Sequence, residues 1–248
     1  MTATPDEARS RDNVLTDLVL ANRILAAQEI FDGWGHVSMR DPEDPTLFTM
    51  SAARAPALVR RRDLVSIRVR DGEPTTGARS YIERHIHAGI YRARSDVTAV
   101  VHCHTEALLP FGVTGTLLRP LAHTDAFLIY GCPIWEIRDA TTRDTMLVDT
   151  PDLGDSLAAS LVAAPVVLMR GHGATIVGCS IQEVVYRAIY TRHAAVADLT
   201  SRTLGPIQYL DHNEAQAAAD SIGKTLDRTW NLWSAEHAPT PSPKRRHR

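Results

Sequence analysis

The alternation of hydrophobic and polar positions along the chain predicts a mixture of helices and strands. Apolar residues recur at helical spacing in four segments, which predict helices at residues 13–29, with Asp12 as the N-cap, and at residues 80–92, 153–161 and 181–203. Shorter apolar or alternating runs predict strands at residues 36–40, 47–51, 63–74 (ending in an Asp-Gly turn), 97–104 and 131–137. Residues 166–178 are expected to form either two strands or a strand and a turn around glycines.

One of these strands ends in two histidines. His102 and His104 close the apolar run at residues 97–104, and residues i and i+2 of a strand point the same way, about 7 Å apart along the backbone. The two imidazoles can therefore converge on one cation. The other His-x-His pair, His85 and His87, falls in a predicted helix, where the side chains are expected to diverge by about 200°.

Two further features favour a metal site. His172 is bracketed by Gly171 and Gly173 after a buried strand, and such glycines let the backbone turn tightly and bring an imidazole close to another element. Glu83 lies in the predicted helix that precedes the His-x-His strand. The alternatives are a tight turn with an incidental histidine and a glutamate on a helix surface. Three imidazoles with one open position are typical of a catalytic divalent site, whereas a structural site is more often closed by cysteines.

The composition narrows the class of protein. The chain has 248 residues, of which 44% are hydrophobic and 23% charged, and its net charge of -2 does not favour nucleic acid. No apolar run approaches the roughly 20 residues of a membrane helix, and the first residues lack a signal-peptide core. The three cysteines do not indicate a disulfide framework, and no dinucleotide-binding or Walker motif is present. We therefore expect a cytoplasmic protein with no nucleic-acid or membrane partner.

Three segments together resemble a known family. The segments "GHVS" at residues 35–38, "ERHIHAGIYRARSDVTAVVHCH" at 83–104 and "RGHGATIVG" at 170–178 resemble the class II aldolase/adducin family, in order, over roughly residues 12–205. The resemblance implies a single α/β domain over residues 1–237, with a three-layer α/β/α fold on a largely antiparallel sheet. It also implies a homotetramer with active sites at subunit interfaces. The proline-rich and then basic tail at residues 238–248 is expected to be disordered.

The resemblance also implies roles for individual residues. The two strand histidines and the glycine-flanked histidine of the family bind a divalent ion, which corresponds here to His102, His104 and His172. The glutamate ahead of them is the acid/base, which corresponds to Glu83. One divalent ion per chain is therefore expected, and such ligands accept zinc, manganese, iron or cobalt.

The chain departs from the sugar-phosphate aldolases of the family at the positions that hold phosphate. Those enzymes carry Gly-Asn in the first motif and a Ser-Ser pair directly before the glutamate, whereas this chain has His36, Tyr81 and Ile82. A phosphate needs several hydrogen-bond donors around it, and isoleucine supplies none. The tyrosine that donates a proton in the aldolases is replaced by Thr124, after His123. These differences disfavour cleavage of a sugar phosphate.

A different set of polar residues favours a carboxylate substrate. His36, Ser38 and Arg40 share one face of a predicted strand, and Arg54 lies in the loop "SAARAP". Arginine makes paired hydrogen bonds to carboxylates, so these four residues are the candidate substrate contacts. The GHVS, RAP and PFG motifs resemble a decarboxylase branch whose members act on hydroxy-methylpyridine dicarboxylate and dihydroxyphthalate.

The expected reaction is decarboxylation of a hydroxylated aromatic acid. Loss of CO2 leaves a carbanion that delocalises onto oxygen, where a chelated divalent ion stabilises the enolate, and Glu83 is the candidate proton donor. One alternative is an aldolase for a non-phosphorylated hydroxy-keto acid. Another is an iron-dependent oxygenase, by resemblance to oxygenases that act on prenylated hydroxyphenylpyruvate. A non-enzymatic adducin-like module is disfavoured, because such relatives have lost metal ligands that this chain keeps.

Overall fold

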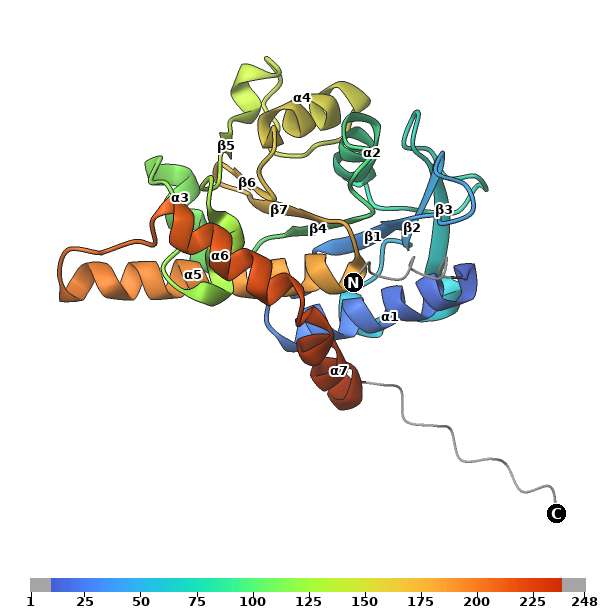
Figure 1. Cartoon of the computed structure of the whole chain (residues 1–248). Coiled ribbons are helices and arrows are strands. Elements are labelled where there is room, and N and C mark those ends of the chain that lie inside the picture. Colours follow the sequence, from blue (N-terminus) through green and yellow to red (C-terminus); the bar gives the residue numbers. More distant parts are fainter. Residues whose placement is uncertain (1–9, 238–248) are drawn as a thin grey trace.

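The computed structural model describes residues 10–237 and contains one seven-stranded sheet (Figure 1). The strands are β1 (His36–Arg40), β2 (Leu47–Ser51), β3 (Leu64–Arg68), β4 (Ala99–Cys103), β5 (Ile134–Trp135), β6 (Val166–Met169) and β7 (Gly173–Gly178). Their order across the sheet is β3-β2-β1-β4-β7-β6-β5. All neighbouring strands are antiparallel except β5 and β6, which confirms the expected largely antiparallel sheet.

Helices cover both faces of this sheet. The α-helices are α1 (Arg11–Ala27), α2 (Arg84–Ala93), α3 (Leu109–Thr114), α4 (Pro151–Leu161), α5 (Ile181–Leu204), α6 (His212–Gly223) and α7 (Leu226–His237). Short 3-10 helices are η1 (Pro56–Leu58), η2 (Arg61–Asp63), η3 (Glu106–Leu108), η4 (His123–Leu128) and η5 (Ile137–Asp139). Figure 1 shows α2 and α4 on one face and α1 and α5 on the other. The predicted three-layer α/β/α arrangement is therefore confirmed.

Each face of the sheet has its own hydrophobic core, and the alternation along β1 shows why. Val37 and Met39 of β1 join the cluster that includes residues of α1 and α5. The alternate side chains of β1, including Ser38, point to the opposite face, where α2 and α4 enclose the second cluster. Strand β4 supplies Val101 to the first cluster and Val100 to the second, as expected for a strand buried on both faces.

Most predicted elements exist, but several boundaries differ. Helix α1 is capped by Ser10, whose side chain accepts a hydrogen bond from the backbone N–H of Asn13, so the prediction of Asp12 as the cap is wrong. Helix α2 begins at Arg84 rather than at Ser80, because the preceding residues form an irregular segment. The strand predicted at residues 131–137 shortens to two residues in β5. Residues 166–178 form two strands.

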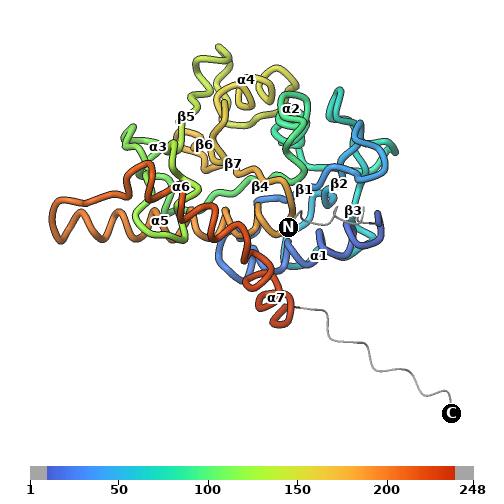
Figure 2. Tube along the Cα trace, in the orientation of Figure 1, coloured from blue at the N-terminus to red at the C-terminus, as the bar shows by residue number. Residues whose placement is uncertain are grey.

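The C-terminal part of the described chain adds two helices that the hydrophobic pattern did not single out. Helix α6 begins at a capping box formed by Asp211 and Glu214 and packs against η4. The trace in Figure 2 shows the chain reversing its direction between α5 and α6. Helix α7 buries Trp230 and Trp233 against α1 and α5. No helix within residues 10–237 is both long and apolar enough to cross a membrane. The tail predicted at residues 238–248 lies outside the described residues.

Candidate metal centre

Four side chains from three parts of the chain meet at the C-terminal end of β4. The Nε2 atom of His104 lies 3.1 Å from that of His102 and 3.1 Å from that of His172. The Oε2 atom of Glu83 lies 3.6 Å from the Nε2 atoms of both His102 and His172. One potential ligand atom from each of the four residues therefore lies within 4.8 Å of the other three.

Glycines bring the third imidazole to β4, as the sequence indicated. His172 lies in the turn between β6 and β7, where Gly171 has a φ of +67°, a conformation that favours glycine. Gly173 passes so close to β4 that an added Cβ would lie 2.1 Å from the carbonyl oxygen of Cys103. Side chains larger than hydrogen would separate the two strands at this point and move His172 away from the cluster.

The ring of His102 is oriented by its neighbours in the sheet. His102 lies opposite His36 of β1 and opposite Thr175 of β7. Its Nδ1 atom is 3.2 Å from the hydroxyl of Thr175, and this contact directs Nε2 toward the cluster. Hydrogen bonds of this kind commonly orient histidines that bind metals.

Glu83 reaches the cluster from the N-cap position of α2, one residue before the helix that was predicted to contain it. Its carboxylate makes no capping hydrogen bond; instead its Oε1 accepts a hydrogen bond of 3.0 Å from the backbone N–H of Val148. Burial alone would raise the pKa of Glu83, but the hydrogen bond with His172 and the charges of His102 and His172 lower this pKa to about 2. Burial also lowers the pKa of His102 well below its usual value. Burial thus favours the neutral form of His102, which is the form of imidazole that binds a metal ion.

These four residues fit a divalent ion. Ligands at 2.0–2.1 Å in a tetrahedron are separated by about 3.3–3.4 Å, close to the nitrogen separations of 3.1 Å found here. Three nitrogens and one carboxylate oxygen suit zinc, manganese, iron or cobalt, and do not select among them. No cysteine belongs to the cluster. The His/Glu set can therefore hold one divalent ion.

A cavity of about 460 Å³ opens beside the cluster. Glu83 and His104 form part of its wall, together with His36 and Arg54 from the predicted substrate contacts. The wall also includes residues that sequence analysis missed, namely Trp34, Arg79, Ser80 and Leu147. Trp34 lies between two glycines just before β1. An isolated aromatic residue in a glycine-containing loop is the sequence feature that could have indicated a cavity-lining residue here.

The structure places the other two predicted substrate contacts elsewhere. The hydroxyl of Ser38 is fully buried and contacts His87 and Tyr91 at 2.6 and 2.8 Å. The guanidinium of Arg40 donates to backbone carbonyls, including those of Tyr91 and Val97. Ser38 and Arg40 lie on the predicted face of β1, but α2 covers that face beyond His36. Neither side chain therefore lines the cavity. We therefore retain only His36 and Arg54 as candidate contacts.

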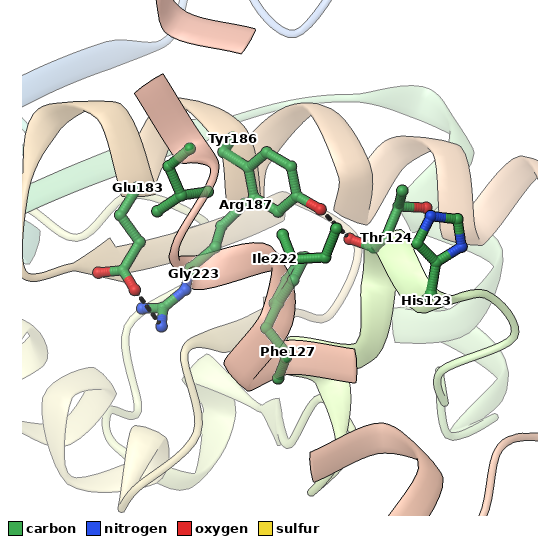
Figure 3. A pocket seen from close by; sticks show the side chains of 10 residues that line it. His123, Thr124, Phe127, Glu183, Tyr186, Arg187, Ile222 and Gly223 are labelled. Carbon is green, nitrogen blue, oxygen red and sulfur yellow. Dashed lines mark hydrogen bonds and ion pairs between the residues drawn. The ribbon is translucent and has the colours of Figure 1, made fainter. Parts of the chain in front are cut away.

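A second cavity has no comparable chemistry. It has a volume of about 70 Å³, lies between η4, α5 and α6, and is lined by His123 and Thr124 (Figure 3). Its charged residues, Glu183 and Arg187, form an ion pair of 2.8 Å. The hydroxyl of Tyr186 donates to the carbonyl oxygen of Thr124. None of the four cluster residues lines this cavity, so the larger cavity is the candidate substrate site.

Comparison with known proteins assigns the family. Residues 16–199 match the Class II Aldolase and Adducin N-terminal domain. The chain belongs to this family. The fold agrees, because L-fuculose 1-phosphate aldolase from Glaciozyma antarctica PI12 superposes with a TM-score of 0.76 over 96% of this chain and 97% of that one, at 20% identity.

Two decarboxylases among the relatives place this class II aldolase-family chain in the decarboxylase-like branch. Decarboxylase tropJ of Talaromyces stipitatus is 37% identical over 238 residues, which cover 86% of this chain and 90% of that protein. The 3,4-dihydroxyphthalate decarboxylase of Terrabacter sp. is 29% identical over 82% of this chain and 87% of its own. A third relative, from Streptomyces roseochromogenus subsp. oscitans, is named 4-hydroxy-3-prenylphenylpyruvate oxygenase/4-hydroxy-3-prenylbenzoate synthase and is 26% identical over 83% of this chain and 73% of its own.

Proposed function

We propose that this protein is a divalent-metal-dependent decarboxylase of a hydroxylated aromatic acid, most favourably one with two carboxylates. The observation that carries the proposal is the position of His36 and Arg54 in the wall of the same cavity as the His/Glu cluster. A cation site and carboxylate donors in the wall of one cavity suit a substrate that has more than one acidic group.

Arg54 has free donors for such a carboxylate. Its Nε atom donates to the carbonyl oxygen of Leu58 at 2.7 Å, which fixes the side chain in place. Among the described residues, its two terminal nitrogens have no hydrogen-bond partner. A guanidinium held in this way can make paired hydrogen bonds to a carboxylate. Arg79 and Ser80 lie in the same wall and add donors that a second carboxylate could use.

The apolar part of the wall suits an aromatic ring. Trp34 is 68% exposed and Ile82 is 58% exposed although both are large hydrophobic residues, and Leu147 is 43% exposed beside them. Aromatic and aliphatic side chains in a cavity wall bind flat apolar ligands by packing and exclude water from them. The proposed substrate therefore combines a ring with acidic groups.

Glu83 is the proposed proton carrier. Glu83 is a carboxylate at neutral pH, and in the proposed cycle it accepts the proton of the substrate hydroxyl on binding. A divalent ion held by the cluster supplies a Lewis acid for the substrate oxygens. Glu83 then returns the proton to the ring carbon as the bond to the carboxylate breaks and CO2 leaves. The product oxygen regains a proton from solvent, so protons balance over the cycle.

The test is CO2 release from a panel of hydroxylated aromatic mono- and dicarboxylates, with protein loaded in turn with each candidate metal. We expect release only from acids with a hydroxyl beside a carboxylate, and faster release when a second carboxylate is present. A panel in which no acid loses CO2 with any of the four metals contradicts the proposal.

The same cluster also supports a second candidate, an aldolase for a non-phosphorylated hydroxy-keto acid. In that reaction Glu83 moves a proton on the carbanion side of the cleaved bond, so the cluster alone does not separate the two. The aldolase reaction would release pyruvate or an aldehyde and no CO2. An oxygenase, as one relative is named, would instead consume O2. Product analysis and an oxygen electrode in the same assay distinguish the three reactions.

We also propose that the protein is cytoplasmic and that it acts as a homotetramer with sites at subunit interfaces. The exposed apolar residues around the cavity mouth, Trp34 and Ile82, favour coverage by a neighbouring chain. Light scattering should therefore give about four times the chain mass of 27.3 kDa. A fully active particle of one chain mass contradicts this.

A further inference from the structure

Behind the cavity wall, four buried side chains form a continuous hydrogen-bonded chain, called here the buried relay: His36, His87, Ser38 and Tyr91. The Nδ1 atom of His36 lies 2.6 Å from Nε2 of His87. The Nδ1 atom of His87 lies 2.6 Å from the hydroxyl of Ser38, which lies 2.8 Å from the hydroxyl of Tyr91. None of the four is more than 3% exposed. The relay begins in the cavity wall and ends beneath α2.

Counting hydrogens gives the direction of the relay. With neutral imidazoles, each of the four groups carries one polar hydrogen, and each of the three contacts uses one. One hydrogen therefore points out of the relay, and because the Ser38 hydroxyl makes no hydrogen bond outside it among the described residues, that hydrogen comes either from Tyr91 or from Nε2 of His36. The acceptor at the Tyr91 end is the carbonyl oxygen of Thr98, at 3.4 Å. That distance is longer than an ordinary O–H···O hydrogen bond, and the same carbonyl already accepts the backbone N–H of Arg40 at 2.8 Å.

The remaining hydrogen is therefore better placed on Nε2 of His36, at the cavity. In this direction Tyr91 donates to Ser38, Ser38 donates to His87 and His87 donates to His36, all over distances of 2.6–2.8 Å. A protonated imidazole would also carry a hydrogen at Nε2 of His36, so the conclusion does not depend on the charge of the relay.

We propose that His87, Ser38 and Tyr91 are positioning residues that present His36 to the cavity as an Nε2–H donor, which binds the second carboxylate of the substrate together with Arg54. This inference rests on the proposed function for the identity of the ligand. A neutral donor has a further advantage here, because the ring of His36 lies 5.1 Å from that of His102. It binds a carboxylate without placing a second positive charge beside a metal ion.

The test compares the binding of phthalate, which has two adjacent carboxylates, with that of benzoate, which has one. Isothermal titration calorimetry on the manganese-loaded full chain measures the ratio of the two dissociation constants. His87→Phe keeps a ring but cannot donate to His36, and we expect it to lower the preference for phthalate at least tenfold. His87→Gln keeps an N–H donor, and its preference should stay within about threefold of wild type.

His85→Gln is the matched control. His85 lies on the same helix, outside the relay, and does not line the cavity, so this variant should keep the wild-type preference. Full preference for phthalate in His87→Phe, or an equal loss in His85→Gln, overturns the proposal.

A second pair of variants covers the case in which His87→Phe does not fold. His36→Gln retains an N–H donor at the cavity and should retain the preference for phthalate, whereas His36→Leu has no donor and should lose it. An unchanged preference in both variants also overturns the proposal.

CO2 release is measured separately on wild-type protein. If no CO2 is released but the preference for phthalate is intact, the proposed reaction is refuted and the relay stands. CO2 release without any effect of these variants refutes the relay alone.

Discussion

The chain carries the His-x-His pattern twice, and the two copies have opposite arrangements. In β4 and the residue after it, His102 and His104 bring their Nε2 atoms to within 3.1 Å of each other. In α2, His87 points to β1 and is hydrogen-bonded there, whereas His85 points to the turn at Gly72 after β3. The same spacing therefore produces one convergent pair and one divergent pair.

The difference follows from the backbone period. Side chains two residues apart share a face of a strand, whereas on a helix they are separated by about 200°. The two pairs also differ in hydrogen bonding, because both ring nitrogens of His87 contact other members of the buried relay. The Nε2 atoms of the strand pair instead face each other and the third imidazole. Only the strand pair brings two imidazole nitrogens together at one point, where a single cation could bind both.

The largest expected effect comes from removing the convergent pair. The double change His102→Ala and His104→Ala removes two of the three imidazoles, so the metal content should fall from about one ion per chain to near zero, with loss of activity. Mass spectrometry of metals after gel filtration measures the content. The double change His85→Gln and His87→Gln is the control and should retain the ion. Full occupancy in the alanine variant would show that these histidines are not the ligands.

The second largest effect is expected from a change at Glu83, which should lower turnover without loss of the metal ion. Glu83→Gln leaves all three imidazoles in place and should retain the cation. Turnover should fall about 10²–10⁴-fold, because the amide cannot carry the proton. Steady-state kinetics and metal analysis on the same sample measure both quantities. An unchanged turnover would remove Glu83 from the mechanism.

A smaller effect is expected from a change at Arg54, in the cavity wall. Arg54→Ala removes the proposed carboxylate contact and should lower kcat/KM at least tenfold, which corresponds to about 1.4 kcal/mol of transition-state binding. Arg62→Ala, a change at an exposed arginine that does not line the cavity, is the control and should have no effect. Equal kinetics in the two variants would argue against a carboxylate at Arg54.

The smallest effect concerns the divergent pair and the pH dependence of stability. Burial lowers the pKa of His87 from 6.5 to about 3. The unfolded chain therefore takes up a proton below pH 6.5 that the folded chain does not, and this lowers the stability of the fold as the pH falls from about 6.5 toward 3. His87→Gln removes that group. Between pH 8 and pH 6, the free energy of unfolding of the variant should therefore fall by about 0.8 kcal/mol less than that of the wild type.

Urea denaturation of the metal-free protein at a fixed concentration measures this difference between pH 8 and pH 6. Parallel pH curves for wild type and His87→Gln would mean that the pKa of His87 is the same in the folded and the unfolded chain, and would contradict the lowered pKa. His85→Gln provides a comparison with the other member of the divergent pair.

The sequence by itself determined the arrangement at the end of β4. The convergence of His102 and His104, the divergence of the helix pair and the turn at His172 all follow from backbone periods and glycine conformations. These are properties of a few consecutive residues. The family motifs added the order of the elements and the three-layer fold. Glu83 was also identified by its motif, although its place at the N-cap of α2 was not.

The tertiary structure alone decided which polar residues face the cavity. His36, Ser38 and Arg40 alternate correctly on β1, yet only His36 lines the cavity, because α2 covers the remainder of that face. Likewise, nothing in the sequence near His87 shows that its ring bonds to His36, 51 residues away. Which helix covers a sheet face depends on packing between distant segments, and a local hydrophobic pattern shows only that a face is covered, not by what.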